Sequence, residues 1–305
     1  MITIVGAGMA GLLAANMLNH HDVEVVEAQP QLPNNHSAVL RFRTANVGTA
    51  LHIPFKAVQM IKDVLPWRNS VADALAYSYK NGCTYRSDRS IISGLVSETR
   101  YIAPDDLLAR MAKRIKITFG FDWHPPTARS DRPIISTIPM PALMGMLNYE
   151  PFPEFDYVEG CNIVAKIISC DAYVSLLVPD PNFSFSRISI TGDKLIVEFP
   201  NQEILINVQA LLNGALELLG LSKNEITDIT VVPQQYAKIQ PIDNETRKQF
   251  IWWATDQYNI YSLGRFATWK PRLLLDDLLQ DVQLIDSWLS SKDQYSIAKL
   301  RVGAK

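Results

Sequence analysis

The sequence predicts an α/β fold in which both ends of the chain build one parallel, helix-covered sheet and a β-rich region is inserted between them. Two observations support this fold class. The chain begins with a strand-like segment, a glycine-rich turn and an apolar helical segment in direct succession, which is how a βαβ unit starts. Between residues 162 and 199 the pattern changes to short strand-like segments separated by turns, as in an antiparallel sheet.

The first turn has the spacing of a dinucleotide-binding motif. After a strand over residues 1–5 come Gly6, Ala7, Gly8, Met9, Ala10 and Gly11. We expect Gly6 to make the tight turn, Gly8 to let phosphates approach the backbone, and Gly11 to let helix and strand pack closely. The next helix offers free N–H groups and the positive end of its dipole to an anion. The motif therefore predicts a Rossmann-like pyrophosphate site.

An acidic residue follows at the expected distance. Residues 22–27 form a second strand-like segment, which ends in Glu27. An acid at this spacing hydrogen-bonds the adenosine ribose hydroxyls. Its charge would repel a 2′-phosphate, so NADP is disfavoured and the choice lies between NAD and FAD.

Further elements divide the chain into two discontinuous domains. Helices are expected over residues 55–65, 70–77, 104–113, 141–147, 208–219 and 272–289. Strands are expected over residues 116–119, 133–139, 162–169, 172–178, 185–190, 194–199, 226–232, 250–254 and 260–263. We assign residues 1–60, 100–145 and 255–300 to the nucleotide-binding domain, and residues 61–99 and 146–254 to a substrate domain.

Composition excludes several classes of protein. The 305 residues are 48% hydrophobic and 20% charged, as in an ordinary globular protein, and no apolar stretch reaches the ~18–20 residues of a membrane span. The first strand leaves no room for a signal peptide, so we expect a cytoplasmic protein. A net charge of −2 gives no general case for nucleic-acid binding. The three cysteines and five histidines lack metal-site spacing, so no metal is expected.

Four segments give the chain a resemblance to a superfamily of FAD flavoproteins that includes amine oxidases, protoporphyrinogen oxidases and UDP-galactopyranose mutases. They are residues 4–11 together with Glu27 and Ala28, residues 134–139, residues 185–189 and residues 263–266. The first and last segments are the specific ones. The resemblance implies FAD as the cofactor and an FAD-binding Rossmann-like domain with an inserted β-rich substrate domain.

The resemblance also implies which residues contact the cofactor. The pyrophosphate would lie on residues 6–11 and the adenosine ribose on Glu27 and Ala28. The remaining contacts would come from Ile117 near the adenine, Thr137, Gly264 and Arg265 along the ribityl–phosphate stretch, and the backbone of Arg272 and Leu273 at the flavin pyrimidine edge. The superfamily's Gly-Gly-Arg segment is absent, and residues 35–43 stand in its place. Either Arg41 or Arg43 is therefore expected to contact a phosphate, unless both are solvent-facing charges.

Three side chains are candidates for substrate contact. Arg187 could bind a carboxylate or phosphate bidentately, or it could stabilise the sheet through a salt bridge. Tyr236 and Trp253 could line the substrate site, although large aromatic residues are more often simple core. No residue is assigned a catalytic role, because the flavin itself carries the redox chemistry in such enzymes.

Three functions are compatible with these residues. The first is an FAD-dependent oxidase or lyase that oxidises the C–N bond of an amine or amino-acid-type group, followed by imine hydrolysis. The second resembles UDP-galactopyranose mutase and uses flavin N5 as a nucleophile without net redox change. The third is an inactive FAD-binding protein.

The short chain refines the substrate expected. Its residues 36–43 and 264–269 resemble compact virus-encoded flavoproteins, some of which trim amino acids from modified thymidine in phage DNA. The substrate expected is therefore a small-molecule amine or a modified nucleobase in DNA, with an amino-acid-decorated thymidine as the first choice. The oligomeric state is left open.

Overall fold

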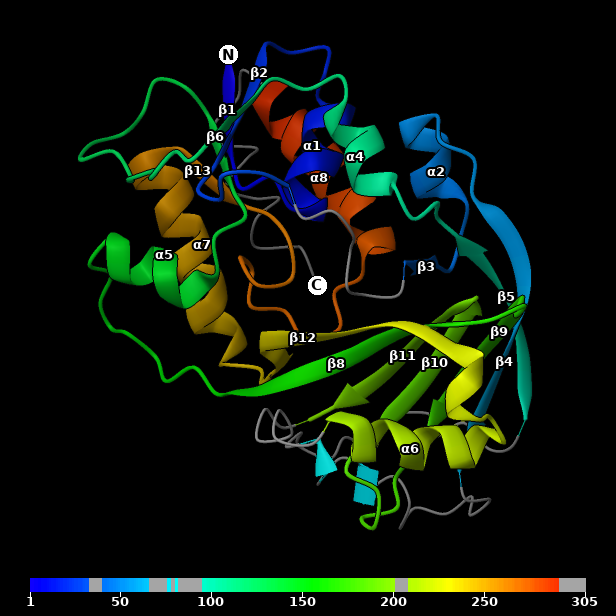
Figure 1. The fold of residues 1–305 in the computed structure, drawn as a ribbon. Helices are drawn as coiled ribbons and strands as arrows, with labels where there is room; N and C mark the ends of the chain where they lie inside the picture. The colour runs from blue at the N-terminus through cyan, green and yellow to red at the C-terminus, as the bar shows by residue number, and fades with distance from the viewer. Residues whose placement is uncertain (33–39, 66–75, 78–79, 82–94, 201–207, 291–305) are drawn as a thin grey trace.

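Two sheets organise the protein, a five-stranded one and an eight-stranded one (Figure 1). The computed structural model describes residues 1–32, 40–65, 76–77, 80–81, 95–200 and 208–290. The smaller sheet is parallel and carries helices on both faces, whereas the larger one is almost entirely antiparallel. The predicted α/β fold class, with a Rossmann-type sheet and a β-rich part, is confirmed.

The parallel sheet is assembled from distant parts of the chain. Its strands are β1 (Ile2–Val5), β2 (Val23–Glu27), β6 (Ile117–Phe119), β7 (Ile134–Ser136) and β13 (Ile260–Ser262). They lie in the order β13-β7-β1-β2-β6. The strand order reverses at β1, which has β2 on one side and β7 on the other. In open α/β sheets ligands bind in the crevice at the carboxyl end of such a switch point, and here the glycine-rich turn follows β1 at that end.

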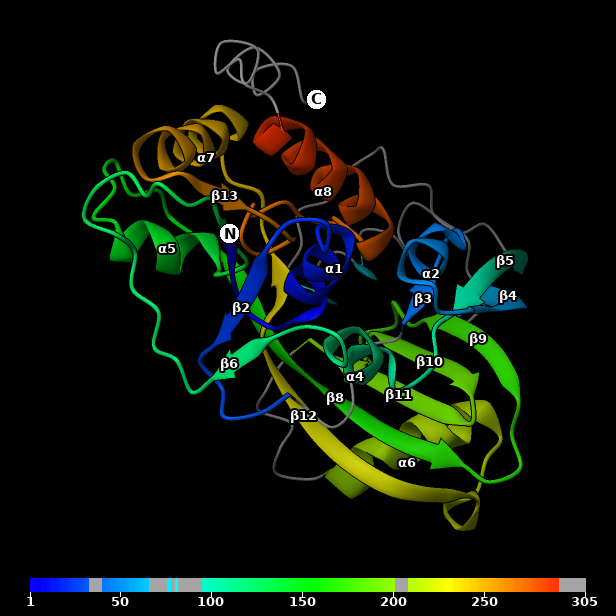
Figure 2. The same ribbon diagram turned by 90° about the horizontal axis from the view of Figure 1, so that it is seen from above.

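Helices cover both faces of this sheet (Figure 2). One face carries α1 (Met9–Met17), α4 (Leu107–Ala112) and α8 (Leu275–Ser290), and the other carries α5 (Met140–Met146) and α7 (Asn244–Tyr258). The strands are consequently apolar on both sides, as β1 is with Ile2, Ile4 and Val5 buried. The short α2 (Asn46–Leu51) packs against α1 and α8.

The larger sheet has the order β12-β8-β11-β10-β9-β4-β5-β3. Its strands are β3 (Arg41–Phe42), β4 (Lys56–Val64), β5 (Val96–Ile102), β8 (Tyr157–Ile167), β9 (Ala172–Leu177), β10 (Arg187–Gly192), β11 (Lys194–Phe199) and β12 (Ile226–Ile239). Helix α6 (Val208–Leu219) covers the face turned away from the parallel sheet (Figure 1), and a short 3₁₀ turn, η2 (Lys223–Glu225), leads into β12. Strands β3 and β4 join this sheet although they begin within residues 1–60.

Two predicted elements are wrong. Residues 55–65 form β4 instead of a helix, because side chains such as Val58 and Met60 alternate between buried and exposed positions with the period of a strand. Residues 250–254 form the middle of α7 instead of a strand. Phe250 and Ala254 lie one helical turn apart and both are buried, as on the inner face of a helix. The aromatic residues between them favour a strand only when they are considered by themselves.

Other differences concern element ends. Strand β12 continues through Pro233 to Ile239, which an edge strand tolerates because a proline there removes no ladder hydrogen bond that the sheet needs. Helix α8 begins at Leu275 rather than at residue 272. The helix expected over residues 70–77 lies largely outside the described residues, as does most of the segment 35–43. Within the described part of the chain, no helix is long and apolar enough to span a bilayer.

Candidate functional site

The turn between β1 and α1 leaves the start of the helix open to a ligand. Gly8 is the N-cap of α1, and no side chain of the described residues caps its amides or places an acid in its first turn. The first amides of a helix need an acceptor from outside the helix. They carry partial positive charge, so an anion such as a phosphate is the matching ligand.

The three glycines of the turn have different surroundings. Gly6 has φ +101°, and a Cβ there would lie 2.1 Å from Thr137 Oγ1. A Cβ at Gly11 would lie 1.9 Å from the Gly6 carbonyl oxygen, whereas one at Gly8 would meet nothing within 4 Å. Gly6 and Gly11 are therefore required by the packing of the protein itself. The space beside Gly8 is open, as the close approach of a phosphate demands.

Glu27 ends β2 directly beside this turn. Its carboxylate accepts hydrogen bonds from the backbone N–H of Ala7 at 2.7 Å and of Gln29 at 2.8 Å. Each carboxylate oxygen can accept more than one hydrogen bond, so the group can hold the turn and still accept a ribose hydroxyl. Ala28 follows at the surface, and Ile117 of β6 lies beside β2, paired with Val25.

The distant end of the chain meets the same turn. Gly264 has φ +100°, and a Cβ built on it would lie 3.1 Å from the Ala10 Cβ at the start of α1. Thr137, which follows β7, is bound to the end of β1: its N–H and hydroxyl donate to the Val5 carbonyl at 3.0 and 2.8 Å. The residues that the sequence assigns to opposite halves of one dinucleotide are thus in contact.

Arg265, Arg272 and Leu273 lead away from this contact. Arg265 donates to the Ala237 carbonyl of β12 at 3.5 Å and stacks on Phe266. Arg272 and Leu273 precede α8 and line a hollow of about 610 Å³ between α7 and α8, within the size range of small-molecule sites. Arg272 has φ +69°, so the chain bends sharply before the helix begins.

The two arginines that could replace the missing Gly-Gly-Arg have different partners. Arg43 forms ion pairs with Asp276, at 3.8 Å, and with Asp277 in the first turn of α8. Arg41 instead lies at the larger sheet, where burial and the nearby charge of Arg187 lower its pKa to about 10. Arg41 is therefore close to the substrate candidate Arg187.

Arg187 and Glu198 form an ion pair on the inner face of the larger sheet. Their neighbours Ile188, Val197 and Phe199 pack on the other face, under α6. Side chains alternate along a strand, so Arg187 and Glu198 point toward the parallel sheet. The Arg187 Nε donates to Glu198 Oε1 at 2.7 Å. Arg187 keeps 36% of its side-chain surface accessible.

Other cationic side chains also act on Glu198. Lys238 approaches its Oε2 at 4.0 Å, and Arg41 also acts on it electrostatically. Burial acts to raise the pKa of Glu198, but the charges of Arg187, Lys238 and Arg41 outweigh it and the pKa is lowered. Among the residues that the structure describes, Glu198 thus lies in a group with Arg187, Lys238 and Arg41, and a group of cationic side chains attracts anions.

The other substrate candidates lie in aromatic clusters. Tyr236 of β12 packs edge-on against Tyr157 and Trp269, and tilted against Phe266. It therefore lies near the segment that begins at Gly264. Trp253 of α7 instead packs on Tyr149, Phe250 and Tyr258, in the core between α5 and α7, and is not part of the group around Arg187.

Sequence reasoning missed Glu198. A signal was present, because Gly192 and Asp193 lie in the short connection between the strands expected over residues 185–190 and 194–199. This turn fixes the register of β10 against β11 and places residue 187 opposite residue 198. Arg41 was one of two arginines expected to contact a phosphate, and its approach to Arg187 comes from the tertiary structure alone.

Searches with the sequence find no matching family model and no matching curated protein. The fold, in contrast, resembles solved structures. A reduced UDP-galactopyranose mutase matches with a TM-score of 0.67 and 14% identity over 97% of each chain. A flavin-dependent brominase, Bmp2, matches with a TM-score of 0.58 and 11% identity over 98% of this chain and 83% of the other. The probable FAD-dependent monooxygenase pqsL of Pseudomonas aeruginosa matches with a TM-score of 0.56 and 12% identity, covering 97% of this chain and 88% of that one. At these identities the likeness is one of fold.

Proposed function

We propose that this chain binds FAD and is a flavin-dependent enzyme acting on a substrate that carries an anionic group. The observation that carries the proposal is the contact between Gly264 and Ala10 beside the open space at Gly8. It joins the adenylate and flavin halves of one expected site. The proteins with similar folds include a UDP-galactopyranose mutase, an FAD-dependent monooxygenase and a flavin-dependent brominase, which supports a flavin over NAD.

The residues of the site suit each part of FAD. The amides at the start of α1 and the space at Gly8 would hold the pyrophosphate, and Glu27 the adenosine ribose. Arg265, Arg272 and Leu273 would follow the ribityl chain toward the isoalloxazine. Bound FAD supplies two-electron redox chemistry, so the protein needs to bind, orient and desolvate the substrate.

The group around Arg187 would bind the substrate anion. Arginine offers a planar fork of donors that matches a carboxylate or phosphate, and Arg41 and Lys238 add charge from neighbouring strands. A carboxylate bound there suits our first candidate reaction, oxidation of the C–N bond of an amino-acid-type group with hydrolysis of the product imine. The amino-acid-decorated thymidine of phage DNA belongs to this substrate class.

A second candidate rests on the likeness to UDP-galactopyranose mutase, which extends over 97% of both chains. A sugar nucleotide carries a diphosphate, and this anion would suit the same cationic group. The two candidates differ in whether electrons leave the substrate.

The first experiment tests the cofactor site. The purified protein should contain FAD, identified by mass spectrometry of the molecule released on denaturation. Gly8→Val should still fold in the cofactor-free state but contain no FAD, because its methyl groups fill the space that the phosphates need. Gly145→Val is the matched control, since a Cβ at Gly145 also meets nothing within 4 Å but lies on α5. Stoichiometric FAD in the Gly8→Val protein would refute the site.

The second experiment separates the reactions. Anaerobic bleaching of the flavin spectrum by an amino-acid-type amine supports C–N oxidation, whereas turnover of a sugar nucleotide only by dithionite-reduced protein supports the mutase-like reaction. In either case Arg187→Gln should raise KM for the anionic substrate and leave FAD content unchanged. A protein whose flavin responds to none of these compounds would contradict both candidates while leaving FAD binding intact.

A further inference from the structure

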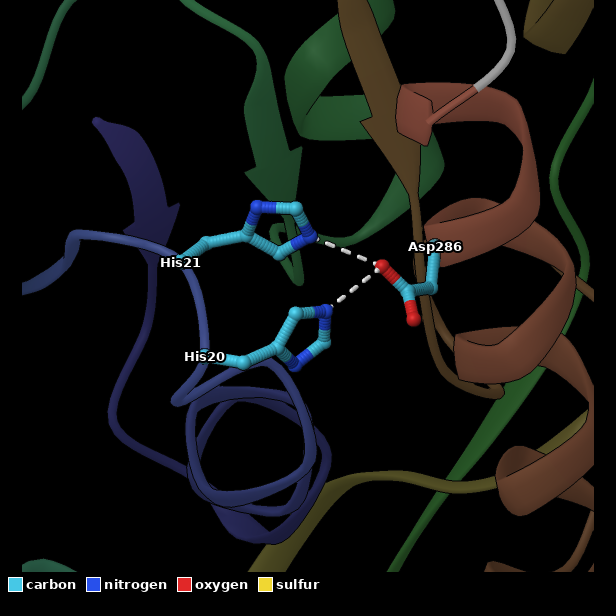
Figure 3. A group of neighbouring side chains, drawn as sticks. All are labelled: His20, His21 and Asp286. Carbon is cyan, nitrogen blue, oxygen red and sulfur yellow. Dashed lines mark hydrogen bonds and ion pairs between the residues drawn. The ribbon is translucent and has the colours of Figure 1, made fainter.

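Two adjacent histidines and an aspartate from the far end of the chain converge at one point (Figure 3). His20 and His21 lie in the turn between α1 and β2, and Asp286 lies on α8. The Nε2 atoms of His20 and His21 approach the same oxygen, Asp286 Oδ1, at 3.2 and 2.8 Å. The two rings lie with their centroids 4.1 Å apart. Three potential metal ligands thus face one another at one place.

The spacing of these atoms is that of a metal site. In a tetrahedral zinc site with ligands about 2.0–2.1 Å from the ion, any two ligand atoms lie about 3.3 Å apart. The two nitrogen–oxygen distances are close to this value, and the three ligand atoms all lie within 4.8 Å of one another. Shifts on the order of 1 Å, which histidine side chains at the surface make easily, would bring all three into coordination.

We propose that His20, His21 and Asp286 bind a divalent transition-metal ion of the zinc class. Imidazole nitrogen and carboxylate oxygen are both ligands that zinc accepts. The side chains are 54%, 29% and 32% exposed, which leaves room for water as the fourth ligand and a path for the ion to enter. The proposal departs from the expectation that no metal binds, and it does not depend on the proposed flavin.

The ion would fasten the last described helix to the first. His20 and His21 follow α1 directly, and α8 packs along α1. An ion bound there links residues 265 positions apart in the sequence. Because an ion that binds only the folded state stabilises it by mass action, zinc should raise the melting temperature and hold α8 in place beside the proposed cofactor site.

The test measures zinc binding by the full chain, freed of any affinity tag and treated with EDTA. Isothermal titration with Zn²⁺ should show one site per chain, and added Zn²⁺ should raise the melting temperature. Loss of an outer-shell partner typically weakens metal binding about 10- to 100-fold, so His20→Gln, His21→Gln and Asp286→Asn should each weaken it by at least that factor. His124→Gln is the matched control, because His124 has one aspartate partner, Asp122 at 3.3 Å, and should bind as the wild type does.

Two outcomes would overturn the proposal. One is a wild-type protein with no Zn²⁺-induced stabilisation, which would leave the cluster as a hydrogen-bonded contact only. The other is Zn²⁺ affinity unchanged in all three variants. Titration of the wild type with Co²⁺ is a test that does not depend on whether the variants fold. Visible bands of a site with nitrogen and oxygen ligands support the proposal. Thiolate charge-transfer bands would instead assign the ion to a cysteine.

Discussion

The three glycines of the first turn have different roles, because their neighbours differ. Gly6 and Gly11 are enclosed by backbone and side-chain atoms of the protein, whereas Gly8 borders open space. Substitutions at Gly6 or Gly11 should therefore affect stability, whereas substitutions at Gly8 should affect ligand binding.

Gly11→Ala should destabilise the protein. The new Cβ would lie 1.9 Å from the Gly6 carbonyl oxygen, so α1 must move away from β1, at a cost typical of overpacking, about 1–3 kcal/mol. Gly8→Ala has open space and an extended backbone, so its cost should be limited to the less favourable N-cap residue, about 0.5 kcal/mol. Urea unfolding of the cofactor-free proteins measures both. Equal midpoints for the two variants would contradict this account.

Glu27→Ala should weaken FAD binding. A hydrogen bond to a charged group contributes about 1.5–3 kcal/mol, and the loss of the bond to the Ala7 amide also loosens the turn. Glu24→Ala is a suitable control on the same strand, because Glu24 bonds the Thr3 hydroxyl instead. Fluorescence titration of the apoprotein with FAD gives both affinities, and equal affinity for Glu27→Ala and wild type would remove Glu27 from the ribose site.

At the scale of the element, α7 shows how a capping residue overrides local composition. Asp243 is its N-cap and accepts a hydrogen bond from the Thr246 amide at 2.8 Å. This bond, with those from the Thr246 hydroxyl and the next amides, lowers the pKa of Asp243. The helix then runs through the aromatic segment that by itself favours a strand.

The lowered pKa makes the stability contributed by this cap depend on pH. A carboxylate whose pKa is lower in the folded state stabilises it above its ordinary pKa of about 3.9 and loses this effect as pH falls through the folded value. Asp243→Ala should therefore lower the melting temperature at pH 7 and have a smaller effect at pH 3. Asp243→Asn keeps an acceptor that does not titrate, so its advantage over alanine should persist at pH 3. A gap between wild type and Asp243→Ala that is the same at both pH values would exclude this role.

At the scale of the whole molecule, the proposed cofactor site forms only because distant segments of the chain meet. Strand β13 pairs with β7, β7 pairs with β1, and Gly264 then packs against α1. A ligand that bridges these segments would stabilise the joined state, by about 2.7 kcal/mol at a free concentration of 100 times Kd.

Hydrogen exchange tests this bridge directly. FAD added to the apoprotein should slow exchange at residues 6–11 and at residues 264–273 together, and Gly8→Val should show neither change. Protection of the first segment alone would mean that only an adenylate group binds. AMP is the control ligand, since it should protect residues near Glu27 without reaching residues 264–273.

Interactions between residues close together in the sequence allowed much of the fold to be predicted. Strand, glycine turn and helix in residues 1–17 follow from sterics that act over a few residues, and the Gly192 turn fixes a hairpin register in the same way. The helix expected over residues 55–65 failed because its apolar side chains fit two periods. Only the sheet that receives β4 decides between them.

Other features were decided by the tertiary structure alone. Arg41 comes within electrostatic range of Arg187 and Glu198, Gly264 packs beside Ala10, and His21 bonds Asp286 only after the chain has folded into two sheets. Contacts between residues so far apart produce no periodic pattern in the sequence, because each contact depends on how whole helices and strands pack. The sequence by itself determined the class of fold and the glycine-rich turn after the first strand, and the packing of its elements determined which distant charges lie close together.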